Sequence, residues 1–61
     1  MNKEKIKEQI LEVRDTGRTN MFDVPQVQRI AFELDLYELV DFLKDRENRK
    51  AYSHFIMTGK L

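Results

Sequence analysis

The sequence predicts an all-α protein, a compact bundle of three to four short helices that forms a single domain over residues 1–61. Two observations support this fold class. Apolar residues recur every three or four positions in several segments, which is the period of a helix with one buried face. Gly17, Pro25 and Gly59 also stand where helices are expected to begin or end, because proline suits a first turn and glycine a left-handed C-terminus.

The first helix is predicted over about residues 3–16. Asn2 precedes it as a capping residue, and Gly17 follows it at the position where a left-handed residue ends many helices. The stripe expected to face the core consists of Ile6, Ile10 and Val13, with Leu11 on its flank.

The second helix, at about residues 24–34, has the clearest start signal in the chain. Asp23 is a good N-cap, and Gln26 lies three residues later, the spacing at which the two residues of a capping box bond each other's backbone N–H. Phe22 precedes the cap and is expected to pack on Val27 as a hydrophobic staple. The stripe expected to face the core consists of Val27, Ile30, Ala31 and Leu34.

Two further helices are predicted at about residues 37–45 and 48–58, separated by a break near Arg46–Asn48. Residues 44–50 contain nothing apolar, and one straight helix would turn the stripe of Phe55 roughly 120° away from that of Leu39. One long helix that reaches a dimer partner is the alternative. The apolar residues expected in the core here are Leu36, Leu39, Val40, Phe42, Leu43, Ala51, Tyr52, Phe55 and Ile56.

Composition argues against several function classes. Eleven basic and eleven acidic residues give a formal net charge of zero, whereas proteins that bind nucleic acid or anionic membranes usually carry net positive charge. The absence of cysteine excludes disulfides and thiolate metal sites. With no signal peptide and no apolar run of about 20 residues, we expect a cytoplasmic protein. Small cores give only about 3–5 kcal/mol of stability, so a homodimer is also a reasonable expectation.

No group of residues has the pattern of a catalytic or metal site. His54 is the only histidine, whereas a metal or acid–base site needs several convergent groups. Ser53 is next to His54 in the sequence, but adjacency does not give the hydrogen bond between a nucleophile and its base. Glycine-rich phosphate loops are absent. The expectation is therefore a protein that is not an enzyme and holds no cofactor or metal.

Residues 28–43 suggest a helix-turn-helix, because two short helices are joined by a tight turn. The presumed recognition helix, however, presents Glu38, Asp41 and Asp45, which would repel phosphates, and the turn carries Asp35 in place of glycine. A nucleic-acid-binding transcriptional regulator is therefore the alternative interpretation, and nucleic acid is not the expected partner.

The middle of the chain is locally acidic, because four acids follow one another from Glu33 to Asp41 without an intervening base. Such a strip is suited to a basic protein surface, although most charged helix faces are simply solvated. Phe32, Tyr37 and Met57 lie off the main apolar stripes and by default fill a second contact in the bundle; if exposed together, they would form a binding or dimer patch. The candidate protein-binding residues are Phe32, Glu33, Asp35, Tyr37, Glu38, Asp41 and Asp45.

Four stretches, at residues 20–23, 27–31, 37–40 and 52–59, resemble a family of uncharacterised short proteins of about 60 residues from phages and prophages. The resemblance covers nearly the whole chain, with residues 44–50 the least similar. The resemblance assigns no role to any residue, but it implies a phage origin. Small phage proteins often bind and block a host protein, including host defence machinery. The leading interpretation is a phage-encoded modulator or inhibitor of a host protein in the bacterial cytoplasm; a self-associating structural accessory protein is a further alternative.

Overall fold

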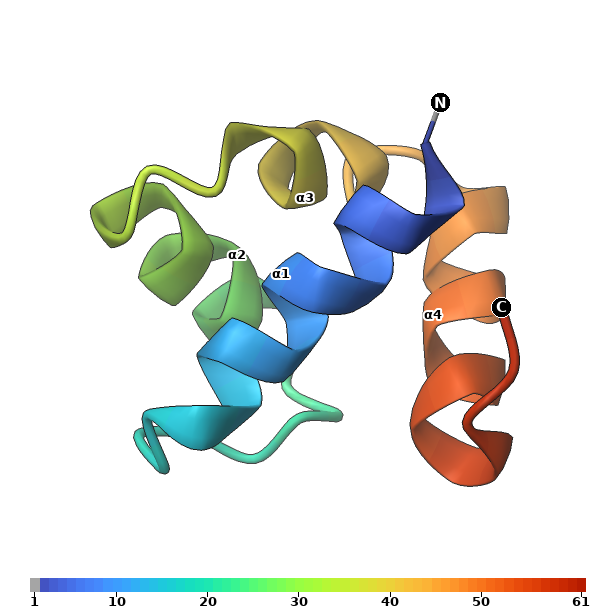
Figure 1. Ribbon diagram of the computed structural model, residues 1–61, viewed down its shortest axis with the longest axis horizontal. Coiled ribbons are helices and arrows are strands. Elements are labelled where there is room, and N and C mark those ends of the chain that lie inside the picture. Colours follow the sequence, from blue (N-terminus) through green and yellow to red (C-terminus); the bar gives the residue numbers. More distant parts are fainter. Residues whose placement is uncertain (1) are drawn as a thin grey trace.

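Four helices and no strand make up residues 2–61, the part of the chain that the computed structural model describes. The helices are α1 (Lys3–Asp15), α2 (Val24–Glu33), α3 (Tyr37–Phe42) and α4 (Arg46–Thr58). Figure 1 shows α1 in the middle of the fold, with α2 and α3 on one side of it and α4 on the other. The predicted all-α bundle is confirmed.

The helices bury each other as fully as those of an ordinary folded monomer. The accessible surface is 4181 Å², and a folded monomeric protein of this mass is expected to expose about 4,200 Å². The long helix considered as an alternative is not formed, since α3 and α4 are separate helices that both turn apolar residues inward.

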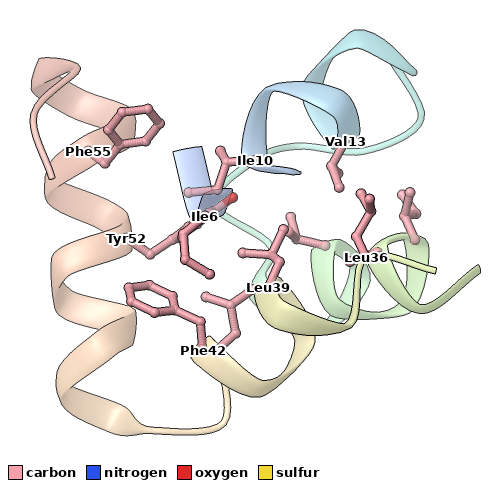
Figure 2. Packing of buried hydrophobic residues seen from close by; sticks show 12 residues of the cluster. Ile6, Ile10, Val13, Leu36, Leu39, Phe42, Tyr52 and Phe55 are labelled. Carbon is pink, nitrogen blue, oxygen red and sulfur yellow. The ribbon is translucent and has the colours of Figure 1, made fainter. Parts of the chain in front are cut away.

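One core joins all four helices. Ile6 and Ile10 of α1 lie between Leu39 of α3 and the aromatic side chains of α4 (Figure 2). The buried apolar residues are Ile6, Ile10, Val13, Val27, Ile30, Ala31, Leu36, Leu39, Phe42, Leu43, Tyr52 and Phe55. Leu34 was predicted to belong to this core, but it is 41% exposed because α2 ends there and the chain turns away.

The helix starts follow the predicted caps only in part. The Asn2 side chain accepts from the Lys5 backbone N–H, and the Asp23 side chain accepts from that of Gln26, at 3.2 and 3.4 Å. The reciprocal half of the predicted capping box is not formed, because the Asp23 N–H donates to the Asn20 carbonyl instead.

The predicted hydrophobic staple is also wrong. Phe22 is 56% exposed and lies outside the core, whereas Met21 on one side of it and Val24 on the other pack against the core. The loop before α2 is therefore anchored through its neighbours rather than through Phe22.

A left-handed aspartate forms the turn between α2 and α3. Asp35 has φ of 62°. The Leu36 N–H donates to the Ala31 carbonyl at 2.8 Å, and the Asp35 N–H donates to the Phe32 carbonyl at 3.1 Å. These two bonds define a Schellman motif, which usually has glycine at the left-handed position. The lack of glycine, which argued against a helix-turn-helix in the sequence, therefore does not prevent this turn from forming.

The break between the last two helices exists but lies earlier in the chain than predicted. Helix α3 ends at Phe42 rather than near residue 45, and α4 begins at Arg46 rather than near residue 48. Asp45 is the N-cap of α4, and its side chain accepts from the Glu47 N–H at 2.8 Å. The Arg49 side chain donates to the Leu43 carbonyl at 2.8 Å and so satisfies the end of α3. As predicted, a left-handed glycine, Gly59, ends α4.

Candidate functional site

Two aromatic side chains lie exposed against each other at the turn between α2 and α3. Phe32 is 61% exposed and Tyr37 is 50% exposed, and their rings pack edge to face with centroids 5.7 Å apart. Phe32 lies on the last turn of α2, away from its buried stripe, and Tyr37 is the first residue of α3. The default expectation that these side chains fill contacts inside the bundle is wrong.

Asp35 fixes the position of Tyr37. The Tyr37 hydroxyl donates to the Asp35 carboxylate at 2.8 Å, and this hydrogen bond, together with the carboxylate charge, raises the pKa of Tyr37. The left-handed turn thus presents two rings and a carboxylate on one exposed surface. We call the surface formed by Phe32, Asp35 and Tyr37 the α2–α3 corner.

Glu38 is held from the neighbouring helix by a glutamine that the sequence analysis missed. The Gln9 side-chain amide donates to the Glu38 carboxylate at 2.6 Å, and this hydrogen bond is the main reason that the pKa of Glu38 lies below its ordinary value. Gln9 is only 4% exposed. Its position, between Ile6 and Val13 on the buried stripe of α1, is the signal that could have identified it.

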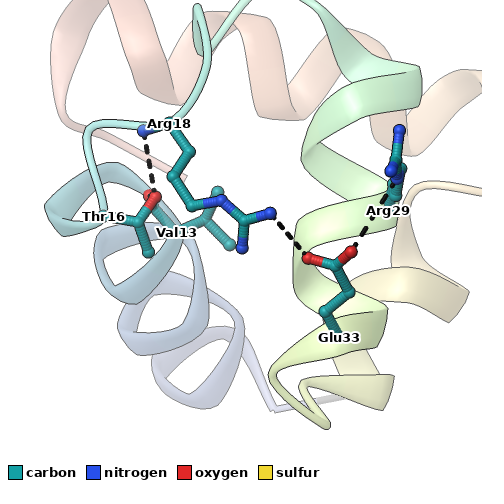
Figure 3. A network of polar contacts seen from close by, with 5 residues as sticks. All are labelled: Val13, Thr16, Arg18, Arg29 and Glu33. Atoms are coloured by element: carbon teal, nitrogen blue, oxygen red, sulfur yellow. Dashed lines mark hydrogen bonds and ion pairs between the residues drawn. The ribbon is translucent and has the colours of Figure 1, made fainter.

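Glu33 does not belong to a free acidic strip. Its carboxylate lies 2.8 Å from the Arg18 guanidinium and 3.8 Å from that of Arg29. Figure 3 shows the two arginine side chains directed at this one carboxylate. Arg18 belongs to the loop after α1, where its backbone N–H donates to the Thr16 hydroxyl. The charge of Glu33 is therefore used to connect this loop to the end of α2.

The two remaining acids of the predicted site also have partners of their own. The Asp41 carboxylate lies 3.1 Å from the Lys44 ammonium, and Asp45 caps α4. Of the seven predicted binding residues, the structure thus brings Phe32, Asp35 and Tyr37 together at the α2–α3 corner. Glu38 is held toward α1 by Gln9, and Glu33, Asp41 and Asp45 are engaged elsewhere.

A second exposed feature lies on the opposite side of α1. A pocket of about 230 Å³ separates α1 from the C-terminal half of α4 and is lined mainly by apolar side chains, among them Ile10, Leu11 and Phe55. Met57, which is 73% exposed, belongs to α4 and not to the corner. This pocket was not predicted from the sequence, because it depends on how closely two helices approach each other.

Two other kinds of site are absent from the described residues. Within residues 2–61 no three His, Cys, Asp or Glu side chains are arranged so that they could hold a metal ion. No helix of the described chain has the length and apolar character needed to cross a membrane.

Comparison with known proteins gives a family without an assigned activity. A family model described as "Domain of unknown function (DUF5049)" matches residues 1–60. No curated protein and no solved structure matches the chain. Since the match spans almost every residue, the expectation of an uncharacterised short-protein family is confirmed, and the chain belongs to the family described as DUF5049.

Proposed function

We propose that this protein is a small protein-binding module whose contact surface is centred on the α2–α3 corner. The observation that carries the proposal is the exposed pair of Phe32 and Tyr37, because aromatic residues are enriched at the centres of protein interfaces. An ordinary interface covers about 800 Å² on each partner, roughly a fifth of the 4181 Å² that this chain exposes. The two rings would form its centre, and the neighbouring charged residues its rim.

We further propose that the partner is a bacterial host protein and that the chain is a phage-encoded modulator or inhibitor in the host cytoplasm, with host defence proteins among the candidate targets. The support is the resemblance of four stretches, residues 20–23, 27–31, 37–40 and 52–59, to short phage and prophage proteins. Under this proposal the protein acts by occupying a surface of its partner and not by catalysis.

Capture from a bacterial lysate on three immobilised chains tests the role of the corner: wild type, Phe32→Ala and Met57→Ala. Met57→Ala is the matched control, because it also removes a large exposed apolar side chain. We expect a stoichiometric protein partner that survives nuclease treatment, remains on Met57→Ala and is lost from Phe32→Ala. Both variants should keep the wild-type stability within about 1 kcal/mol, since neither side chain is in the core. Equal capture by both variants would contradict the assignment of the corner.

A helix-turn-helix regulator is the second candidate, and the tight turn at Asp35 is the observation that favours it. Against it, the exposed side of α3 carries Glu38 and Asp41. Nucleic acid that co-purifies and dissociates steeply with salt would support this candidate. A homo-oligomer in light scattering, without any captured protein, would support the self-associating accessory protein.

A further inference from the structure

We infer that the α2–α3 corner recognises a basic segment of its partner, with an arginine or lysine side chain lying on the rings of Phe32 and Tyr37 and its charge facing Asp35. This inference rests on the proposed function and adds the chemistry of the partner to it.

Charge at the corner is the first support. Glu33 and Asp41, two of the acids near the corner in the sequence, form ion pairs with arginine or lysine. Asp35 forms none with any described residue, and its hydrogen-bond partner is the neutral Tyr37 hydroxyl. The Asp35 carboxylate therefore keeps further acceptor positions for a cationic donor.

The two rings are the second support. The face of an exposed aromatic ring attracts a cation through its quadrupole, and a guanidinium can stack on a ring while pairing with a carboxylate. Phe32 and Tyr37 present such rings on both sides of the turn, and the hydrogen bond to Asp35 holds Tyr37 in place. A carboxylate next to a preordered aromatic pair thus offers both interactions that an arginine side chain can make.

Other occupants fit this surface less well. Nucleic acid would bring phosphates toward Asp35, and like charges repel. An apolar helix would leave the Asp35 carboxylate without a counterion at the interface, at a cost in desolvation. A basic peptide segment satisfies this carboxylate and covers the rings together.

Selection from a displayed library of random 12-residue peptides, with wild-type protein as the immobilised target, tests this inference. We expect the enriched peptides to share an arginine or lysine next to an apolar residue. Their affinity should fall about threefold in Asp35→Asn. Asparagine tolerates left-handed backbone and still accepts from Tyr37, so the variant changes charge with little change in shape. Glu8→Gln is the control, because Glu8 is an exposed acid without an ion pair among the described residues, and it should leave affinity unchanged.

Every other outcome overturns the inference, and the outcomes separate failure of the basic partner from failure of the corner as a binding surface. Enriched peptides that lack a basic residue but lose binding to Phe32→Ala would refute the basic partner and leave the corner as a binding surface. Peptides that bind Phe32→Ala as well as wild type would refute both proposals, and so would a library without an enriched motif. A dimer in analytical ultracentrifugation that Phe32→Ala dissociates would assign the corner to a second copy of the chain.

Discussion

The side-chain oxygen of Gln9 accepts a hydrogen bond from the backbone N–H of Leu39 at 2.8 Å, so that α1 caps α3. Helix α3 has only six residues, and the residue at its N-cap is Leu36, which has no side chain that can accept a hydrogen bond. Leu39 is the third residue of this helix and carries one of the N–H groups that a helix cannot satisfy by itself. The start of α3, and with it the α2–α3 corner, therefore depends on a residue 30 positions earlier.

Gln9→Ala should lower the free energy of unfolding by about 1–3 kcal/mol, because it leaves the buried N–H of Leu39 without its acceptor. Urea denaturation followed by circular dichroism measures the change. Glu12→Ala is the control: it removes an exposed polar side chain from the same helix and should change stability by no more than about 0.5 kcal/mol. Equal stabilities for the two variants would mean that water can replace the Gln9 cap.

The hydrogen bond that Gln9 donates to Glu38 should be detectable in the pKa of Glu38. In the folded protein the pKa of Glu38 lies below its ordinary value of 4.5, chiefly because of the hydrogen bond from Gln9. In Gln9→Ala that pKa should rise toward 4.5, which NMR of the side-chain carboxyl carbon can follow. A pKa that stays at the wild-type value would show that Gln9 is not the cause of the shift.

The lowered pKa of Glu38 also predicts how the free energy of unfolding depends on pH. A carboxyl whose folded pKa is lowered contributes stability above the unfolded pKa and loses it as pH falls through the folded value. The contribution of the Gln9–Glu38 pair should thus be fully present at pH 7 and decline below about pH 4.5.

The elements that the sequence predicted well depend on local signals. The start of α1 after Asn2, the start of α2 after Asp23 and the end of α4 at Gly59 each rest on a residue within one helical turn of the boundary. The break before α4 was displaced for a different reason. Asp45 was assigned to the exposed face of α3, whereas it is the N-cap of α4. The sequence does not distinguish these two roles, because aspartate is common in both positions.

What the sequence could not predict depends on contacts between distant residues. Met21, rather than Phe22, packs against the core. The Met21 carbonyl accepts a hydrogen bond from the Tyr52 hydroxyl, and these two residues are 31 positions apart in the sequence. Glu33 is removed from the predicted acidic strip of residues 33–41 because Arg18, in the loop after α1, forms an ion pair with it. The pair of Asp41 and Lys44, by contrast, has a local spacing on or near one helix and could have been anticipated from the sequence.

Tyr52→Phe should destabilise the fold by about 1–2 kcal/mol, because the ring remains and only the hydrogen bond to the Met21 carbonyl is lost. Tyr52 is fully buried, so water cannot readily replace the hydroxyl. Tyr37→Phe is the matched control and should change stability by less than about 0.5 kcal/mol, because its hydrogen bond is exposed. Thermal or urea unfolding of both variants gives the comparison, and the reverse ranking would contradict the role assigned to Tyr52.

Tyr52 should also make the fold sensitive to alkaline pH. Burial raises the pKa of Tyr52 from 10.0 to about 12. Between these values the unfolded chain loses the phenol proton while the folded chain keeps it, so stability is complete below pH 10 and is lost as pH rises toward 12. The stability difference between wild type and Tyr52→Phe should therefore shrink from pH 9 to pH 11. A constant difference across this range would show that Tyr52 ionises equally in both states.

The left-handed backbone of Asp35 predicts an unusual order of stabilities at this position. With φ of 62°, Asp35→Ala places a Cβ in a conformation that costs roughly 1 kcal/mol, whereas Asp35→Gly removes that strain. We expect Asp35→Gly to be at least as stable as wild type and Asp35→Ala to be less stable than Asp35→Gly by about 1 kcal/mol, in urea denaturation. Both variants remove the acceptor of the Tyr37 hydroxyl, so their comparison isolates the backbone. If alanine were tolerated as well as glycine, the turn would not require the left-handed conformation that places Phe32 beside Tyr37.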